Sequence, residues 1–580
     1  MQVVPPTEIL SHRYLFSEFN LEEISRMLAA LCPQRACTVL VSKSVEPTAN
    51  LKEPWYGTRF SLGPVPPEKL STWSAAQPTP GSKLRLPNPN PFIPTDFSLA
   101  CDREGAPVSD GTELPKLVLT SPFCRLWHKT DSTFRRPKTN LYIDLVAPVA
   151  YEAPAHVCLT RIFTKLLEDE LTEFAYDAQC AMLDYSVYNC STGLRIMLGG
   201  YSHKMPVLLE KVLTKMMSAE LAEERFVAIK EMVQREYKNF FKEQPYQHAM
   251  YVASQMLEAS RWHILKYLEF SLSEGCSHAA LVHFAREILL KKVQLKVLCH
   301  GNTDAAQVIE WASKAKATLG SAELEALPEL RLHKLPAGVT TILRQHPTLL
   351  TEKQAAVSNA DETNSATEVY LQVGGEKRPE SVLLELAAQV INKPAYHQLR
   401  TTEQLGYIVF TGSRCDLGVI GLRCLVQSST HDAAYLDERI ELFLASVPAL
   451  IEAMTDEEFL NHRKAIIDLK LEKPKRLRQE SSRYWSEIPL ETLDFNRDED
   501  DAKVLETTTK QELADFWDRY FAASGPDRRK LSTQIFAGQH ALPPAPTGAS
   551  FRCIDGLVAS AEFKATLDTF PPASSFAAEH

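Results

Sequence analysis

The chain has 580 residues, of which 44% are hydrophobic and 23% are charged, and its formal net charge is −10 at pH 7. At roughly 100–200 residues per domain, this length predicts three or four domains with an ordinary globular composition. The acidic balance argues against a nucleic-acid-binding protein, whose binding face is basic.

The cysteines and the lengths of the apolar runs indicate the cellular compartment of the protein. The twelve cysteines include no Cys-x-x-Cys pair, which favours scattered reduced thiols over a disulfide framework or a cysteine-type zinc site. No run approaches the ~18 apolar residues of a membrane span. Residues 1–6 lack the basic and apolar regions of a secretion signal. We therefore expect a cytosolic protein with no membrane partner.

Residues 1–85 carry one helical pattern and one strand pattern. Residues 37–41 are typical of a short strand. Before them, apolar side chains recur at helical spacing, namely Leu21, Ile24, Met27, Leu28 and Leu31. Because one helix and one strand cannot bury their own apolar faces, we expect this segment to be the C-terminal remnant of a domain. A proline-rich linker, residues 86–116, should follow in an extended conformation.

A compact domain is predicted for residues 117–325. Its pattern starts with a strand at 141–146 and a long helix after Pro154, whose apolar residues keep a three/four spacing. Strands at 185–189 and 194–198, helices between 207 and 290, and a strand at 293–299 complete it.

The same order recurs in residues 326–580. A strand at 368–373 precedes a helix at 381–398, two strands at 407–412 and 418–426, and a helix at 435–453. An internal duplication explains the repeat, so we predict an α+β protein with two homologous α/β-sandwich domains after the partial domain and linker.

No metal site is predicted. The nearest candidate is a helix with His278, His283 and Glu287, but histidines five residues apart point away from each other on a helix. Motifs for a serine nucleophile, a phosphate loop or a dinucleotide are absent from the sequence. Cys415 and Cys424 have no obvious histidine partner for thiol catalysis.

Arg400 and Tyr407 are the candidate catalytic residues. Arg400 is placed at a helix end and Tyr407 at the start of the next strand. A guanidinium fork and a phenol donor suit the binding of a peptide carbonyl and of the oxyanion that develops from it. The alternative is structural: Arg400 would pair with an acid such as Glu403, and Tyr407 would be a half-buried strand residue.

A second candidate is a group of cations around Pro474. It comprises Lys470, Lys473, Lys475, Arg476 and Arg478. Basic clusters are usually solvated faces, but in an acidic protein such a group can also bind a polyanion.

Several stretches in the right order resemble the insulysin-type members of the pitrilysin family of zinc metallopeptidases. The longest is Leu-Arg-Thr-Thr-Glu-Gln-Leu-Gly-Tyr-Ile-Val-Phe at 399–410. The others lie at 53–58, 92–97, 199–204, 243–250 and 472–475. The family's zinc motif, His-x-x-Glu-His followed by a distant Glu, does not occur in this sequence.

The resemblance implies four homologous α+β domains arranged as two halves that close around a peptide. Zinc and its ligands would belong to the first domain of a complete enzyme, whereas this chain would hold no cofactor. Arg400 and Tyr407 match the family residues that bind the scissile region of the substrate.

The resemblance also implies partners. The chain should bind short peptides and act with an N-terminal catalytic half, on the same or a separate polypeptide, being inactive alone; a homodimer is a further expectation. The segment with Lys473, Lys475, Arg476 and Arg478 resembles one associated with ATP or polyphosphate. The alternative is a non-catalytic subunit of a heterodimeric peptidase, which would bind peptides or a partner.

Overall fold

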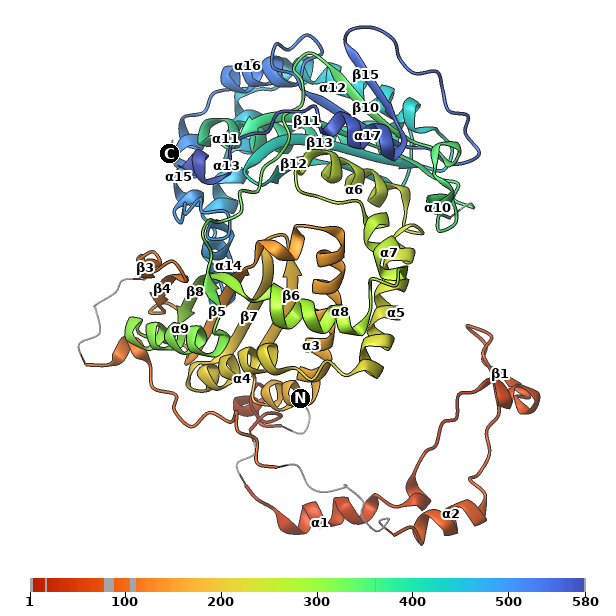
Figure 1. Cartoon of the computed structure of the whole chain (residues 1–580), viewed down its shortest axis with the longest axis vertical. Coiled ribbons are helices and arrows are strands. Elements are labelled where there is room, and N and C mark those ends of the chain that lie inside the picture. Colours follow the sequence, from red (N-terminus) through yellow and green to blue (C-terminus); the bar gives the residue numbers. More distant parts are fainter. Residues whose placement is uncertain (1–3, 16–17, 78–87, 105–110, 360, 578–580) are drawn as a thin grey trace. The chain divides into compact units, whose positions relative to one another are not determined.

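The computed structural model describes residues 4–15, 18–77, 88–104, 111–359 and 361–577. It divides into two units, Met1–Pro89 and Asn90–His580. The first unit (Figure 1) contains η1 (Pro6–Glu8), α1 (Leu21–Ala30), η2 (Pro33–Arg35), η3 (Lys43–Thr48), β1 (Leu51–Lys52), β2 (Arg59–Phe60) and α2 (Pro67–Ser74).

The expected helix forms in the first unit, but the expected strand does not. Asn20 caps α1, because its side chain accepts a hydrogen bond from the backbone N–H of Glu23. The strand predicted at 37–41 is wrong: these residues are in no sheet, and Val39 and Val41 are 80% and 90% exposed. A strand forms only against a partner strand, and among the described residues of this unit only β1 and β2 pair.

The second unit begins with a seven-stranded sheet in the order β3-β4-β8-β5-β7-β6, with β9 beside β8. Its strands are β3 (Lys116–Thr120), β4 (Cys124–Thr130), β5 (Lys138–Val146), β6 (Asp184–Cys190), β7 (Gly193–Tyr201), β8 (Lys292–Gly301) and β9 (Ala322–Glu323). Its helices are η4 (Ala100–Asp102), η5 (Pro148–Tyr151), α3 (Pro154–Cys180), η6 (Ser202–Lys204), α4 (Met205–Ser218), α5 (Glu223–Phe240), α6 (Pro245–Leu257), α7 (Ile264–Leu272), α8 (His278–His283), η7 (Phe284–Leu289) and α9 (Ala305–Leu319). The apolar face of α3, for example Phe163 and Leu166, is buried in one core with Ile143 and Leu145 of β5.

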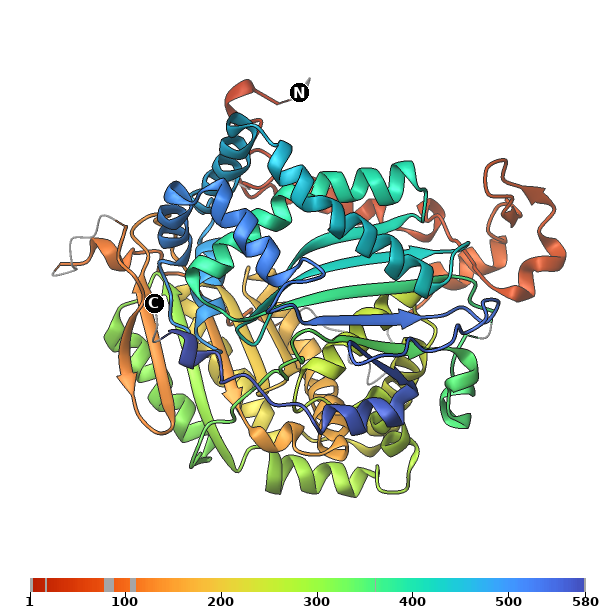
Figure 2. The ribbon, with the colours of Figure 1, turned by 90° about the horizontal axis from the view of Figure 1, so that it is seen from above.

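A six-stranded sheet follows in the order β12-β13-β11-β14-β10-β15. Its strands are β10 (Thr340–Gln345), β11 (Ser365–Gly375), β12 (Ile408–Asp416), β13 (Val419–Ser428), β14 (Lys530–Ile535) and β15 (Phe551–Asp555). Its helices are η8 (Pro347–Leu349), α10 (Glu352–Ala355), α11 (Arg378–Ala395), η9 (Tyr396–Thr402), α12 (Ala433–Ala453), α13 (Asp456–Lys470), α14 (Leu477–Glu487), α15 (Arg497–Thr507), α16 (Lys510–Tyr520), α17 (Gly556–Lys564) and α18 (Ser574–Ala577). Figure 2 shows α11 and α12 together over one side of this sheet, where their apolar residues form its core.

Five strands of each sheet share one topology. Read from one edge, β6-β7-β5-β8-β4 corresponds to β12-β13-β11-β14-β10, whereas the sixth strands differ, because β3 pairs antiparallel with β4 and β15 pairs parallel with β10. In each sheet the fourth and fifth strands are parallel (β8 with β4, β14 with β10), whereas the first four pair antiparallel. The predicted α+β class with two domains of one fold is thus confirmed; the domain limits 117–325 and 326–580 stay predictions.

Equivalent helices are exchanged between the two domains (Figure 1). Helix α6, which follows α4 and α5, packs on β11 and β14 of the second sheet. Helix α14, which follows α12 and α13, packs on β5 and β8 of the first sheet. Each domain therefore covers the open face of the other, which makes residues 90–580 one unit rather than two separable domains.

The segment that precedes β3 lies on the first domain. Phe92 is fully buried, and its ring is 4.8 Å from that of Phe174, while Phe97 and Tyr201 are 5.5 Å apart. Positions 86, 87 and 105–110 of the predicted linker lie outside the described residues. Among the helices that the structure describes, none combines the length and the apolar character that crossing a bilayer requires.

Candidate functional site: Arg400 and Tyr407

The local backbone around Arg400 departs from a regular α-helix. Helix α11 contains Pro394, which has no N–H to bond to the preceding turn, and the chain continues as the π-helical segment η9. Leu399 and Leu405 are buried on the core side, and the N–H of Leu405 donates to the carbonyl oxygen of Leu399 at 3.0 Å. The chain thus folds back tightly between Arg400 and Tyr407.

This fold-back stacks Arg400 on two tyrosines. The Arg400 Cζ lies 4.4 Å from the ring centroid of Tyr407 and 4.9 Å from that of Tyr396. Tyr407 is 82% exposed. Contacts of a guanidinium with aromatic faces restrain the group while its N–H edge stays available for hydrogen bonds.

The structural alternative, in which Arg400 pairs with Glu403, is wrong because Glu403 has other partners. Glu403 is engaged by Arg439 (Nε–Oε2 2.7 Å), whose guanidinium lowers the pKa of that carboxyl, and by Gln398 at 2.8 Å. Within the described part of the chain, Arg400 has no ion pair and no side-chain hydrogen bond. Its donors are therefore free to meet an external carbonyl or carboxylate.

Gly406 and Gln427 fix the turn that carries Tyr407. A Cβ at Gly406 would overlap the carbonyl oxygen of Gln427 in β13, so only glycine fits this close approach. The Gln427 side chain also donates to Gln244 Oε1 at 2.7 Å and accepts from the N–H of Tyr246 at 3.0 Å. The N-terminus of α6 thus supports the candidate site from the other domain.

The basic group around Pro474 is only partly available. The Lys470 side chain is only 9% exposed, and its ammonium contacts Glu385 (2.8 Å) and Asp501 (2.9 Å). The other four cations are exposed in the loop between α13 and α14 and at the start of α14, and Lys475 pairs with Glu472 at 2.6 Å. The cations that face solvent are Lys473, Lys475, Arg476 and Arg478.

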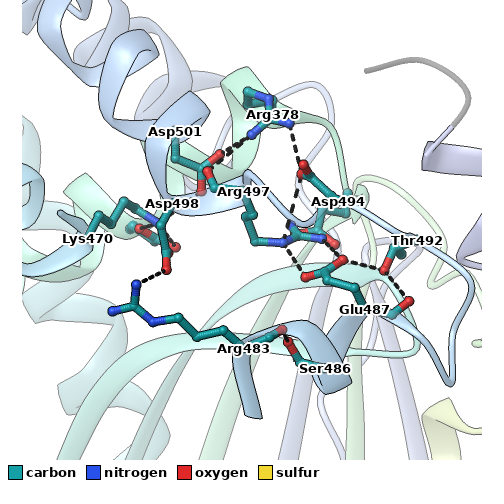
Figure 3. A network of polar contacts seen from close by, with 12 residues as sticks. Arg378, Lys470, Arg483, Ser486, Glu487, Thr492, Asp494, Arg497, Asp498 and Asp501 are labelled. Carbon is teal, nitrogen blue, oxygen red and sulfur yellow. Dashed lines mark hydrogen bonds and ion pairs between the residues drawn. The ribbon is translucent and has the colours of Figure 1, made fainter. Parts of the chain in front are cut away.

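A partly buried ion-pair network anchors this region (Figure 3). Arg378 binds Asp494 and Asp501, each at 2.8 Å, and Arg497 binds Glu487 at 2.7 Å. These contacts hold α15 against the start of α11. Each carboxylate labelled in Figure 3 is paired with an arginine, so we assign the network a structural role.

The residues described contain no group of three His, Cys, Asp or Glu side chains that could hold a metal ion. The residues of the rejected metal-site candidate make other contacts. The His278 ring lies 2.6 Å from the carbonyl oxygen of Leu221, and Glu287 pairs with Lys291 at 3.0 Å. The zinc that the family resemblance implies therefore finds no fitting ligand set among the described residues, and no chemical step is assigned to it on this chain.

Sequence patterns did not predict two sets of residues that hold the site in place. Tyr396 was not predicted, because only a π-helical turn brings its ring onto the Arg400 guanidinium. Gln244 and Gln427 lie 183 residues apart, and only the exchange of α6 between domains brings them together.

Comparisons with known proteins agree with this architecture. Residues 1–270 match the family described as "Middle or third domain of peptidase_M16", and residues 386–485 match "PQQ synthase PqqF-like, C-terminal lobe domain 4". The insulin-degrading enzyme of Drosophila melanogaster is 34% identical over 93% of this chain and 53% of that protein. The human insulin-degrading enzyme is 33% identical over 95% of this chain and 52% of that protein.

A solved structure shows the same fold. The crystal structure of pitrilysin superposes with a TM-score of 0.74 at 20% identity, covering 87% of this chain and 50% of that chain. The chain spans about half the length of the curated relatives it matches. By sequence and by fold, it belongs to the pitrilysin (M16) family of peptidases and is related to the C-terminal half of the insulin-degrading enzymes.

Proposed function

We propose that this chain is the substrate-enclosing half of a zinc metalloendopeptidase that degrades short peptides. Arg400 and Tyr407 would bind the carbonyl of the scissile bond, and the zinc would be held by an N-terminal half on the same or a separate polypeptide. The observation that carries the proposal is the Arg400 guanidinium, which is stacked on Tyr396 and Tyr407 and has no protein acceptor among the described residues.

The chemistry of these two side chains fits peptide hydrolysis. As water adds to a peptide carbonyl, negative charge develops on the oxygen, and prepositioned donors stabilise it. The exposed Tyr407 hydroxyl and the guanidinium edge are two such donors. The chain would be inactive alone, because its described residues contain no group of side chains that could hold zinc.

The first unit has an exposed apolar surface that a partner would cover. Side chains on the apolar face of α1 are exposed, and residues 37–41 carry a strand pattern without a partner strand. An N-terminal half could cover this helix face and pair with these residues. That arrangement would complete the domain of which residues 1–85 are expected to be the end.

The test is reconstitution. The chain and the zinc-bearing N-terminal half of the Drosophila insulin-degrading enzyme would be co-expressed, co-purified and assayed with a fluorogenic peptide and zinc. We expect cleavage by the complex and none by the chain alone. Cleavage that is equally fast with Arg400→Ala, or a chain that cleaves by itself, would contradict the proposal.

The alternative is a non-catalytic subunit that binds peptides or a partner. It would be favoured if the complex binds the peptide and fails to cut it. ATP or polyphosphate is proposed as a regulator at Lys473, Lys475, Arg476 and Arg478, since these exposed cations form a polyanion-type surface. A cytosolic location and a homodimer complete the proposal.

A further inference from the structure

A large cavity lies at the junction of the two domains of the second unit. Its volume is about 930 Å³, and it is bordered by the turn between α6 and α7, by the connector at 328–333 and by α17. This volume falls in the range of small-molecule sites, roughly 300–1,000 Å³, which are common at domain interfaces. Most of the wall is apolar, with Val149, Met256, Leu330, Leu343 and Leu557 among its residues.

Lys564, the last residue of α17, places a cation in this wall. The side chain is half-buried, and its ammonium donates to the carbonyl oxygens of Gln255 (2.8 Å) and Arg261 (3.4 Å). An ammonium has three donors, so these two bonds leave one. Over the described ranges, no carboxylate lies within ion-pair distance of Lys564.

The groups around Lys564 do not neutralise it. Burial lowers its pKa to about 8, Glu258 acts in the opposite sense, and Arg261 lowers the pKa further. Glu258 is itself bound by Arg261 at 2.5 Å. On the connector, His333 is buried, and burial together with the Lys564 charge lowers the pKa of its imidazole.

The other charged groups that line the cavity differ from Lys564. Lys266 is exposed and pairs with Glu269 at 3.3 Å, while Glu329 pairs with Arg331. Glu152 is exposed. Lys564 is therefore a desolvated cation without an anion, next to a large apolar wall, and an external anion would compensate its charge.

We propose that this cavity binds a carboxylate carried by an apolar chain, with the Lys564 ammonium receiving the carboxylate and the apolar wall covering the chain. Such a group can come from a free aliphatic acid or from the C-terminus of a peptide that ends in apolar residues. The site needs neither zinc nor a second polypeptide, so its test is independent of the proposed peptidase activity.

The test is calorimetric titration of the full chain with octanoate, octan-1-ol and octylammonium at pH 7. We expect octanoate to bind at least about tenfold more tightly than the other two, because hydrogen bonds to charged groups are the strong ones. Lys564→Met should remove that advantage and leave octan-1-ol unchanged. The matched control Lys266→Met, at a paired lysine of the same cavity, should change octanoate affinity less than twofold.

Two further measurements keep the proposal falsifiable if Lys564→Met disturbs folding. Octanoate affinity of the parent chain should fall above pH 8, where Lys564 loses its proton, and Ala561→Trp should fill the cavity and weaken octanoate and octan-1-ol together. An acetylated tetrapeptide ending in Leu-Leu, as free acid and as amide, identifies the peptide source if only the acid binds. No binding of octanoate or the peptide acid, or equal binding of octanoate and octylammonium, would overturn the proposal.

Discussion

The Cζ atom of Arg400 lies 4.4 Å from the ring centroid of Tyr407, although the two residues come from different elements, η9 and the turn before β12. The contact brings a fixed cation and a phenol hydroxyl to one exposed point. Tyr396 covers the same guanidinium at 4.9 Å. The arrangement predicts different effects for the two tyrosines.

Tyr396 should act as a positioning residue. Tyr396→Leu removes one of the two rings that hold the guanidinium, and we expect kcat/KM of the reconstituted peptidase to fall about two- to fivefold, the size of an exposed cation–π contact. Tyr396→Phe keeps the ring and should restore the parent value. If Phe is as damaging as Leu, the ring is not what Arg400 requires.

Gly406 should be indispensable for the geometry of the turn. In Gly406→Ala the new methyl group collides with the carbonyl oxygen of Gln427, and we expect a loss of about 1–3 kcal/mol in the free energy of unfolding. Gly374→Ala is the matched control, because no atom lies within 4 Å of its Cβ position. Denaturant unfolding of both variants measures the difference, and equal stabilities would refute the steric explanation.

The exchanged helix α14 carries a buried ion pair. Lys129 of β4 is 4% exposed and binds Glu480 and the Tyr484 hydroxyl. Glu480→Gln leaves the ammonium without its anion, and we expect a loss of about 3 kcal/mol in the free energy of unfolding. Glu472→Gln, which breaks the exposed pair with Lys475, should leave it unchanged in the same urea titration. A Glu480 variant as stable as the parent would show that the pair does not hold the domains together.

His300 should make this interface sensitive to acid. Its ring is fully buried, and burial, assisted by the charge of Lys129 and by His128, lowers its pKa to about 3. Glu480 is 4.0 Å away, but its carboxylate already serves Lys129 and Tyr484. Burial therefore outweighs that attraction and keeps the imidazole neutral.

Below about pH 6.5 the unfolded chain binds a proton at His300 and the folded chain does not. The contribution of the neutral His300 ring to the free energy of unfolding is therefore complete above that pH and is lost as the pH falls. Between pH 7.5 and 5 we expect this group to remove about 1–2 kcal/mol from the free energy of unfolding. Urea titrations at both pH values give the difference, which should shrink in His300→Asn. An unchanged difference in the variant would contradict this assignment.

Much of the fold follows from periodicity, while its long-range arrangement does not. The apolar spacing along α3 and α11 and the short apolar-rich runs of β5 and β11 identify both domains, because these patterns reflect burial against neighbouring layers. The strand predicted at 37–41 does not form, because an apolar run does not reveal whether a partner strand exists. The exchange of α6 and α14 is invisible to local patterns, since both helices would be amphipathic on either sheet.

The candidate site was predictable only in part. Arg400 and Tyr407 stand out through the family resemblance, whereas their stacking depends on a π-helical turn that no residue pattern marks. Lys470 belongs to the basic stretch in sequence, yet its side chain is largely covered and pairs with Asp501. Spacing could not separate it from the exposed cations, because its partner comes from α15.

The most direct test of the central claim is the turnover of Tyr407→Phe in the reconstituted peptidase. If the hydroxyl stabilises the developing oxyanion, kcat should fall roughly 10–1000-fold, since one such donor contributes about 2–4 kcal/mol to the transition state. KM should change less, and the thermal unfolding of the variant should match the parent because Tyr407 is exposed. A kcat within twofold of the parent would contradict the role of Tyr407 at the cut peptide bond.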